Sequence, residues 1–290
     1  MQTHLWTRSL RDRPASYGNP MRIVVTAKYV PDINTDRGFS GGRVVRSAAE
    51  GTLNELDENA IEAALRLVEA AREAGTLGPD EGEVVVVTMA GPDGDVALRK
   101  AFQLGVDRGI RVSGDELAGS DYFGTAAVLA AAVRRLGAES PVDLVVTGMA
   151  ALDGLGSVVP TLLGAELGLP TLNLAKKVEL ADRVLTITRE ADDVTEVLSA
   201  PLPAVLSVTD GANQPRFPGF KLIMAARTKE IEVWTPADLG LDPATAGSAG
   251  ARTEVLTAAP RPERAEPEIV TDKGEGGVAL ADFLIRNDLV

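Results

Sequence analysis

Phosphate binding is the chemistry that the residue types of this chain support best. A loop of small residues, Gly148-Met149-Ala150-Ala151-Leu152-Asp153-Gly154-Leu155-Gly156-Ser157-Val158-Val159-Pro160, follows an apolar run and opens a helix. Its glycines let the backbone approach a ligand, Ser157 can cap the helix, and Pro160 is tolerated in the first helical turn. We expect free N–H groups and the positive end of the helix dipole to form an anion site without a basic side chain.

A second loop is a candidate for the same site. Asn54 is a good N-cap residue and Asp57 follows three positions later, which resembles a capping box. If both helices begin at the carboxyl ends of a parallel sheet, their N-termini line the crevice where open α/β sheets bind ligands. Two plainer readings remain open: Asn54 is only a cap, or Gly154 and Gly156 only make a tight turn.

Two common nucleotide motifs are absent. Gly154-Leu155-Gly156 lacks the third glycine of a dinucleotide fingerprint, Pro160 intrudes, and the loop follows the fourth apolar run instead of the first. No Walker A pattern occurs in the sequence. The sequence therefore argues against a nicotinamide dehydrogenase and against a P-loop ATPase.

Composition narrows the chemistry further. The chain has 290 residues, no cysteine and one histidine, His4. Thiolate nucleophiles, iron–sulfur ligation and cysteine-bound zinc are excluded, so a hydrolase would have to work with carboxylates and lysine alone, and redox chemistry needs a borrowed cofactor. The net charge of −13 disfavours nucleic-acid binding.

The hydrophobic pattern alternates between two kinds of element. Apolar runs rich in Val and Ile predict buried parallel strands at 22–27, 83–88, 107–112, 142–147 and 203–208. Amphipathic patterns predict helices at 57–73, 95–104, 121–136 and about 157–167. Strand and helix in alternation predict a doubly wound, mostly parallel α/β sheet.

Several segments fall outside this alternation. Residues 31–47 predict a hairpin excursion, and the runs 175–180, 184–189 and 194–198 predict a small antiparallel addition. We expect residues 1–20 to be a disordered tail and residues 21–233 to form the α/β domain. No run reaches the ~20 apolar residues of a membrane helix, and the tail lacks a secretory h-region, which predicts a cytoplasmic protein without membrane insertion.

Residues 234–290 form an extended C-terminal arm in this reading. Ala, Pro, Gly and Thr dominate to about residue 275, and an apolar helix is predicted at 278–289. Such a segment cannot bury enough apolar surface to fold alone. It is either a disordered linker with a frayed helix or an arm that packs on a partner subunit through Leu280, Phe283, Leu284 and Leu289.

Residues 212–232 predict a protein-docking surface. They place a tight loop, an exposed apolar tip and a basic helix directly after a buried strand. With two other segments, they carry a resemblance to the β subunit of electron transfer flavoproteins over residues 21–290. Asn54–Leu67 resembles that family's Asn-Pro-Phe/Tyr-(Asp/Cys)-Glu helix start, 88–109 its Met-Gly-Ala-Asp-Arg segment, and 213–229 its Asn-Glu-Pro-Arg-(Tyr/Phe) loop.

The resemblance implies an adenine-nucleotide-binding fold and an obligate heterodimer with an α subunit that holds most of an FAD. The β subunit would bury an AMP with a structural role and complete the FAD site. The dimer would accept electrons from flavin dehydrogenases, such as acyl-CoA dehydrogenases, and pass them to a quinone reductase. The resemblance implies, in addition, that the chain has no metal site and no catalytic residue and is not an enzyme by itself. Alternatives are a bifurcating subclass with a second FAD in place of AMP, and a flavin-free ATP/AMP-binding sensor of the same fold.

The resemblance also implies roles for particular residues. Those that would line the AMP pocket are Thr26, Asn54, Glu55, Leu56, Asp57, Met89, Ala151, Leu152, Asp153, Gly154, Leu155, Gly156, Ser157, Val158 and Val159. Asp153 would hydrogen-bond a hydroxyl or the adenine edge, and the N–H groups of residues 157–159 would take the phosphate. Ile33 and Leu56 would lie near the flavin. Partner docking, within 209–230, would fall to Ala212, Asn213, Gln214, Pro215, Arg216 and Phe217.

Overall fold

The computed structural model describes residues 21–35, 37–46, 49–260, 262 and 267–290, so the expected tail at 1–20 lies outside the described residues. The chain divides into two compact units, Met1–Thr257 and Ala258–Val290. The first unit extends past the expected boundary at residue 233. Trp234 is buried, and Ser248 donates its N–H to the carbonyl of Ala118, so these residues pack with the sheet-bearing unit.

The core of the first unit is a parallel sheet. Within the described residues, seven strands pair in the order β14-β7-β6-β1-β8-β13-β9. Their bounds are β1 Arg22–Thr26, β6 Glu83–Met89, β7 Arg108–Val112, β8 Leu144–Gly148, β9 Thr171–Ala175, β13 Ala204–Val208 and β14 Glu232–Trp234. All the pairings are parallel, and β1 lies in register with β6 (Arg22↔Glu83) and β8 (Ile23↔Leu144).

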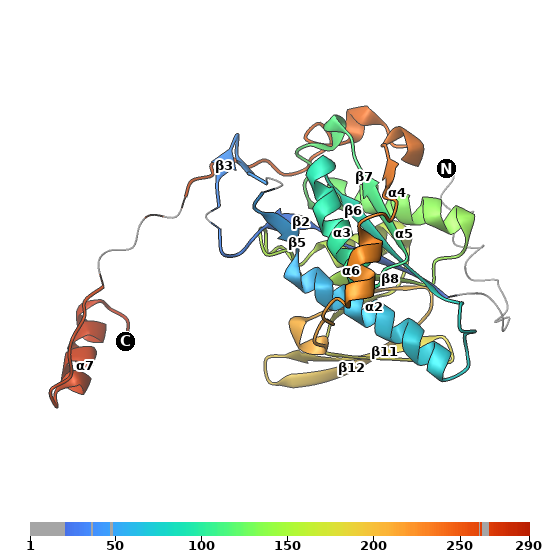
Figure 1. The fold of residues 1–290 in the computed structure, drawn as a ribbon. Helices are drawn as coiled ribbons and strands as arrows, with labels where there is room; N and C mark the ends of the chain where they lie inside the picture. The colour runs from blue at the N-terminus through green and yellow to red at the C-terminus, as the bar shows by residue number, and fades with distance from the viewer. Residues whose placement is uncertain (1–20, 36, 47–48, 261, 263–266) are drawn as a thin grey trace. The chain divides into compact units, whose positions relative to one another are not determined.

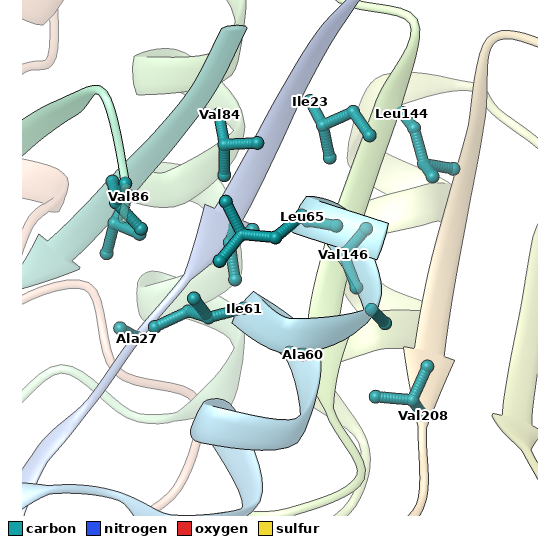
Figure 2. Packing of buried hydrophobic residues seen from close by; sticks show 14 of the residues in the cluster. Ile23, Ala27, Ala60, Ile61, Leu65, Val84, Val86, Leu144, Val146 and Val208 are labelled. Carbon is teal, nitrogen blue, oxygen red and sulfur yellow. The ribbon is translucent and has the colours of Figure 1, made fainter. Parts of the chain in front are cut away.

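Helices cover both faces of this sheet, which confirms the predicted doubly wound α/β fold (Figure 1). On one face lie α2 (Glu55–Glu73), α3 (Asp95–Leu104) and α6 (Phe220–Ala226); on the other lie α4 (Tyr122–Glu139) and α5 (Val159–Leu167). Alternate strand residues serve the two faces, because successive side chains of a strand point in opposite directions. Figure 2 shows Ile61 and Leu65 of α2 packed among side chains from the strands, including Ile23.

The antiparallel additions are also present. The hairpin excursion has a base of β2 (Tyr29–Pro31) and β5 (Gly51–Leu53) and a tip of β3 (Phe39–Ser40) and β4 (Arg43–Val44). A separate antiparallel sheet contains β10 (Lys177–Ala181), β11 (Val184–Ala191) and β12 (Val194–Pro201). Short 3₁₀ helices lie at Pro92–Gly94, Asp115–Leu117, Asp210–Ala212, Ala237–Leu239 and Pro243–Thr245.

Two local predictions were wrong, and the strand β14 was not predicted. Ala175 ends the parallel strand β9 instead of beginning an antiparallel one, because a left-handed Leu174 (φ 61°) turns the chain before β10. β14 has only three residues, too few to show a hydrophobic period. The helix expected at 225–230 is the apolar helix α6, which ends at Ala226, before the basic residues.

The second unit contains α7 (Gly276–Arg286). Asp272 accepts the N–H groups of Gly274 and Gly276, and Arg286 pairs with Glu268 at 2.8 Å. Apolar side chains of α7, including Val278, Leu280 and Ile285, are exposed. None of the described helices combines the length and apolar character needed to cross a membrane.

Candidate functional site

The carboxyl edge of the sheet divides between β1 and β8. From β1 the chain crosses to β6 and then β7 on one side, and it returns to place β8 on the other side of β1. Loops that leave in opposite directions at such a switch point open a crevice for ligands. The predicted nucleotide-site segments meet at this edge: Thr26 ends β1, Asn54–Asp57 begins α2, Met89 ends β6, and 151–159 follows β8.

Asn54 joins the two loops of the site. Its amide Nδ2 donates to the carbonyl of Ala150 at 2.9 Å, and its Oδ1 accepts the N–H of Leu152 at 3.1 Å. Asn54 does occupy the N-cap position of α2, but it makes no side-chain capping bond. The predictions that Asn54 is a simple cap or part of a capping box were therefore wrong. Its side-chain amide is fully buried and is hydrogen-bonded to the backbone of residues 150–152 instead.

Asp57 lies buried where β1, α2 and β8 converge. Its Oδ2 accepts the backbone N–H of Lys28 at 2.8 Å. A Cβ atom on Gly148 would lie 2.6 Å from Oδ1 of Asp57 and 2.6 Å from the carbonyl oxygen of Leu56, so only glycine fits there. Burial raises the pKa of Asp57 to about 7, and hydrogen bonds from Lys28, Asn54 and Gly148 oppose this only in part. The site therefore holds a carboxyl group that titrates near neutral pH.

The loop after β8 presents unused backbone donors. Leu155 and Ser157 have left-handed conformations, with φ of 47° and 52°. The N–H groups of Gly156, Ser157 and Val158 find no acceptor within the described part of the chain. Consecutive donors in alternating left- and right-handed conformations form an anion-binding concavity. Ser157 does not cap α5 as expected, because the left-handed turn leaves Val158 at the N-cap position.

Two cations that the sequence reading missed flank this loop. The carboxylate of Asp153 is only 1% exposed; its Oδ1 lies 2.7 Å from Nζ of Lys28 and its Oδ2 lies 3.0 Å from Nε of Arg46, with Nη2 of Arg46 also bonded to Oδ2. Burial acts to raise the pKa of Asp153, but Lys28 and Arg46 outweigh it and hold that pKa below its ordinary value. The sequence analysis did not anticipate these basic side chains, and both the anion site formed by backbone donors and the ligand contact expected of Asp153 stay predictions.

Other residues enclose the edge of the loop. Arg37 donates from Nη2 to the carbonyl of Leu152 at 2.8 Å, so the hairpin excursion reaches the loop at a second point. The ring of Tyr122 lies against Gly156, where a Cβ atom would collide with it. Ile33, expected near the flavin, is half exposed on the turn after β2, whereas Leu56 lies in the first turn of α2.

The predicted docking loop is held by α2. Asn59 donates from Nδ2 to the carbonyl of Asn213 at 2.9 Å, and Asn213 returns a bond to the carbonyl of Asn59 at 3.0 Å. The guanidinium of Arg216 donates from Nε to Glu62 at 2.7 Å and from Nη1 to Glu69 at 2.7 Å. One helix thus carries part of the nucleotide site in its first turn and the anchor of the loop in its following turns.

The docking residues consequently have different surroundings. Asn213 and Arg216 face α2, Ala212 packs against the core, Pro215 is half-buried, and Gln214 is exposed but offers its carbonyl to Arg66. Phe217 is 97% exposed. Burial acts to raise the pKa of Glu62, but bonds from Arg216 and Arg66 outweigh it and lower that pKa. The apolar tip is therefore Phe217, with Phe220 of α6 also exposed nearby in the sequence.

Sequence signals existed for some of the missed residues. Lys28 directly follows the first apolar run, and Arg46 ends the Arg43-Val44-Val45-Arg46 segment of the hairpin. A cation that directly follows a buried strand lies at the ligand edge of the sheet. Glu62 and its partner Arg216 are 154 positions apart, and neither spacing nor composition relates them.

Comparisons with known proteins find a matching family and similar proteins over most of the chain. The profile of the family "Electron transfer flavoprotein domain" matches residues 41–239. "Electron transfer flavoprotein subunit beta" of Mycobacterium tuberculosis is 39% identical over 271 residues, covering 92% of this chain and 99% of the relative. The protein of that name from Mycobacterium leprae is 37% identical with the same coverage. "Caffeyl-CoA reductase-Etf complex subunit CarD" of Acetobacterium woodii is 31% identical over 87% of this chain and 92% of its own length.

Proposed function

The chain belongs to the electron transfer flavoprotein family as a β subunit, and we propose that it binds AMP at the switch point and completes the FAD site of an αβ electron carrier. Family membership implies an α-subunit partner. In this proposal the dimer takes electrons from flavin dehydrogenases, such as acyl-CoA dehydrogenases, and passes them to a quinone reductase. This chain supplies binding surfaces and no acid, base or nucleophile.

The donor set at the switch point carries the proposal. Three adjacent backbone N–H groups, at residues 156–158, have no acceptor among the described residues and can take phosphate oxygens, and Lys28 and Arg46 add positive charge at Asp153 of the same loop. Asn54 holds the backbone of this loop at Ala150 and Leu152. Gly148 lets α2 and β8 approach closely, and Gly156 leaves room for the ring of Tyr122 against the loop. This set fits a nucleotide with one buried phosphate.

The flavin supplies the electron chemistry when it is bound, and this chain contributes a wall to its site. Ile33 and Leu56 are the residues proposed to lie near the ring. Residues 234–290 are proposed to include the arm that packs on the α subunit, and the exposed apolar residues of α7 are suited to such packing. The loop 209–217, with Phe217 at its tip, is proposed to dock the electron donor.

Identification of the bound nucleotides tests this function. The chain would be purified alone and with its α subunit, denatured, and the released nucleotides separated by chromatography and identified by mass. We expect AMP from this chain in both preparations and one FAD per dimer. Two FAD per dimer with no AMP would assign the chain to the bifurcating subclass. ATP without flavin in the complex would instead favour the nucleotide sensor.

A further inference from the structure

We infer that Lys28 and Arg46 recognise the phosphate of the bound nucleotide, and that Asp153 positions both cations instead of contacting the ligand. The inference deepens the proposed function and rests on it. It concerns a cluster in which three segments far apart in the sequence meet: the residue after β1, the hairpin excursion, and the loop after β8.

Asp153 uses both of its carboxylate oxygens in this cluster, whereas Lys28 and Arg46 each keep hydrogen-bond donors that are not used within the described part of the chain. Both carboxylate oxygens of Asp153 are engaged by the two cations, and its side chain is almost fully enclosed. Lys28 has three ammonium donors, of which one is bonded to Asp153. Arg46 uses Nε and Nη2 on Asp153, while its Nη1 has no acceptor within the residues that the structure describes. Free capacity therefore lies on the cations.

The charge of the cluster points to an anionic ligand. One lysine is enough to neutralise one buried carboxylate, so Arg46 leaves the cluster with a surplus positive charge. The side chains of Lys28 and Arg46 are 43% and 35% exposed, so their remaining donors can reach a ligand. In a chain of net charge −13, such a surplus attracts a phosphate locally, although the whole surface repels it.

The backbone of the cluster ties it to the phosphate loop. The N–H of Lys28 is bonded to Asp57, and the carbonyl of Lys28 accepts the N–H of Asn54. Arg37 holds the carbonyl of Leu152, next to Asp153. The cations are therefore bonded through Asp153 to the same loop that carries the free N–H groups of residues 156–158. The phosphate oxygens of a nucleoside phosphate can accept hydrogen bonds both from the cations and from the backbone N–H groups. A nucleoside has no phosphate and therefore offers no negative charge to either set of donors.

A matched pair of ligands tests the inference. The nucleotide-free full-length chain, its Lys28→Gln and Arg46→Gln variants and the control Lys177→Gln would each be titrated calorimetrically with AMP and with adenosine. Lys177 carries the same charge but lies on β10, paired with Glu179 at 2.8 Å. We expect each of the two site variants to weaken AMP binding about tenfold or more, since hydrogen bonds to charged groups have this strength. Adenosine binding should stay within about twofold of the unmodified chain.

The outcomes separate the inference from the proposed function. Equal weakening of AMP and adenosine would show that the cations act on the shape of the pocket, and this would overturn the inference. Unchanged AMP binding in both site variants would overturn it as well. If the unmodified chain bound neither AMP nor adenosine, the proposed AMP-binding function would be overturned, and the inference that rests on it would be overturned as well. Lys177→Gln should match the unmodified chain with both ligands.

Discussion

The carboxyl group of Asp57 accepts the backbone N–H of Lys28 at 2.8 Å and thereby fastens the first turn of α2 to the end of β1. Gly148 of β8 lies against the other oxygen, so three elements of the switch point meet on one buried side chain. The charge state of this group and the space around it should therefore be measurable in the stability of the whole domain.

Stability should fall as pH rises through the titration of Asp57. Its pKa is raised from 3.8 to about 7 in the folded chain, so between these values the folded state binds more protons than the unfolded state. The contribution of Asp57 to the free energy of unfolding should drop by about 3 kcal/mol from pH 5 to pH 8. Urea unfolding of the unmodified chain and of the Asp57→Asn variant, repeated across this pH range, gives the free energy of unfolding as a function of pH for each protein. The difference between these two curves measures the contribution of Asp57. Parallel curves would contradict the prediction.

Gly148→Ala should separate α2 from β8. The new methyl group would meet the carbonyl of Leu56 and the carboxyl of Asp57, and neither belongs to a flexible chain end. We expect a loss of about 3 kcal/mol in the free energy of unfolding and loss of the bound nucleotide. Gly91→Ala is the control, because a Cβ atom there has nothing within 4 Å and its effect should stay within about 0.5 kcal/mol. Similar denaturation midpoints for both variants would refute the proposed close approach.

Two threonines in neighbouring parts of the sheet should respond in opposite directions to the same change. The hydroxyl of Thr88 is buried without a hydrogen-bond partner in the described residues, whereas that of Thr147 donates to the carbonyl of Gly148 at 2.9 Å. Thr88→Val should raise the free energy of unfolding by about 1 kcal/mol, and Thr147→Val should lower it by a similar amount. Thermal and denaturant unfolding decide the sign, and a destabilised Thr88→Val would show that its hydroxyl has a partner in solution.

Arg216 and Phe217 of the docking loop should affect different properties: Arg216 the stability of the fold, and Phe217 the rate of electron transfer. Arg216→Met removes the main partner of the buried Glu62, which should cost about 3 kcal/mol of stability and loosen the loop. Phe217→Ser should change stability by less than about 0.5 kcal/mol, because its ring is exposed. It should nevertheless slow electron transfer from an acyl-CoA dehydrogenase about tenfold. Unfolding curves and stopped-flow reduction of the αβ dimer measure both effects. An unchanged rate for Phe217→Ser would remove Phe217 from the docking surface.

The fold could be predicted because its signals are local and strong. The Val-rich runs that became β1, β6, β8 and β13 are buried on both faces, and the helices between them show a clear apolar stripe. The strand β14 and the end of β9 carried no such signal. β14 is too short to show a period, and β9 is redirected by the left-handed Leu174 instead of by a Gly or Pro.

The site was predictable in position but not in detail. Glycines and small residues after a buried strand mark the loop at 148–160, and their location at the switch point follows from strand order. The use of Asn54 as a bridge and the pairing of Asp153 with Lys28 and Arg46 depend on contacts between residues more than 90 positions apart. Only tertiary packing decides whether a polar side chain caps its own helix or binds a distant loop.

The docking loop owes its shape to side-chain bonds from α2 and not to its own tip. Asn59 is hydrogen-bonded to Asn213, and Glu62 and Glu69 are bonded to Arg216. The side chain of Phe217, in contrast, is exposed. Mutations at the tip are thus decoupled from folding. Under the docking role proposed for this loop, exchange of Phe217 could therefore alter the choice of redox partner in evolution while the scaffold stays intact.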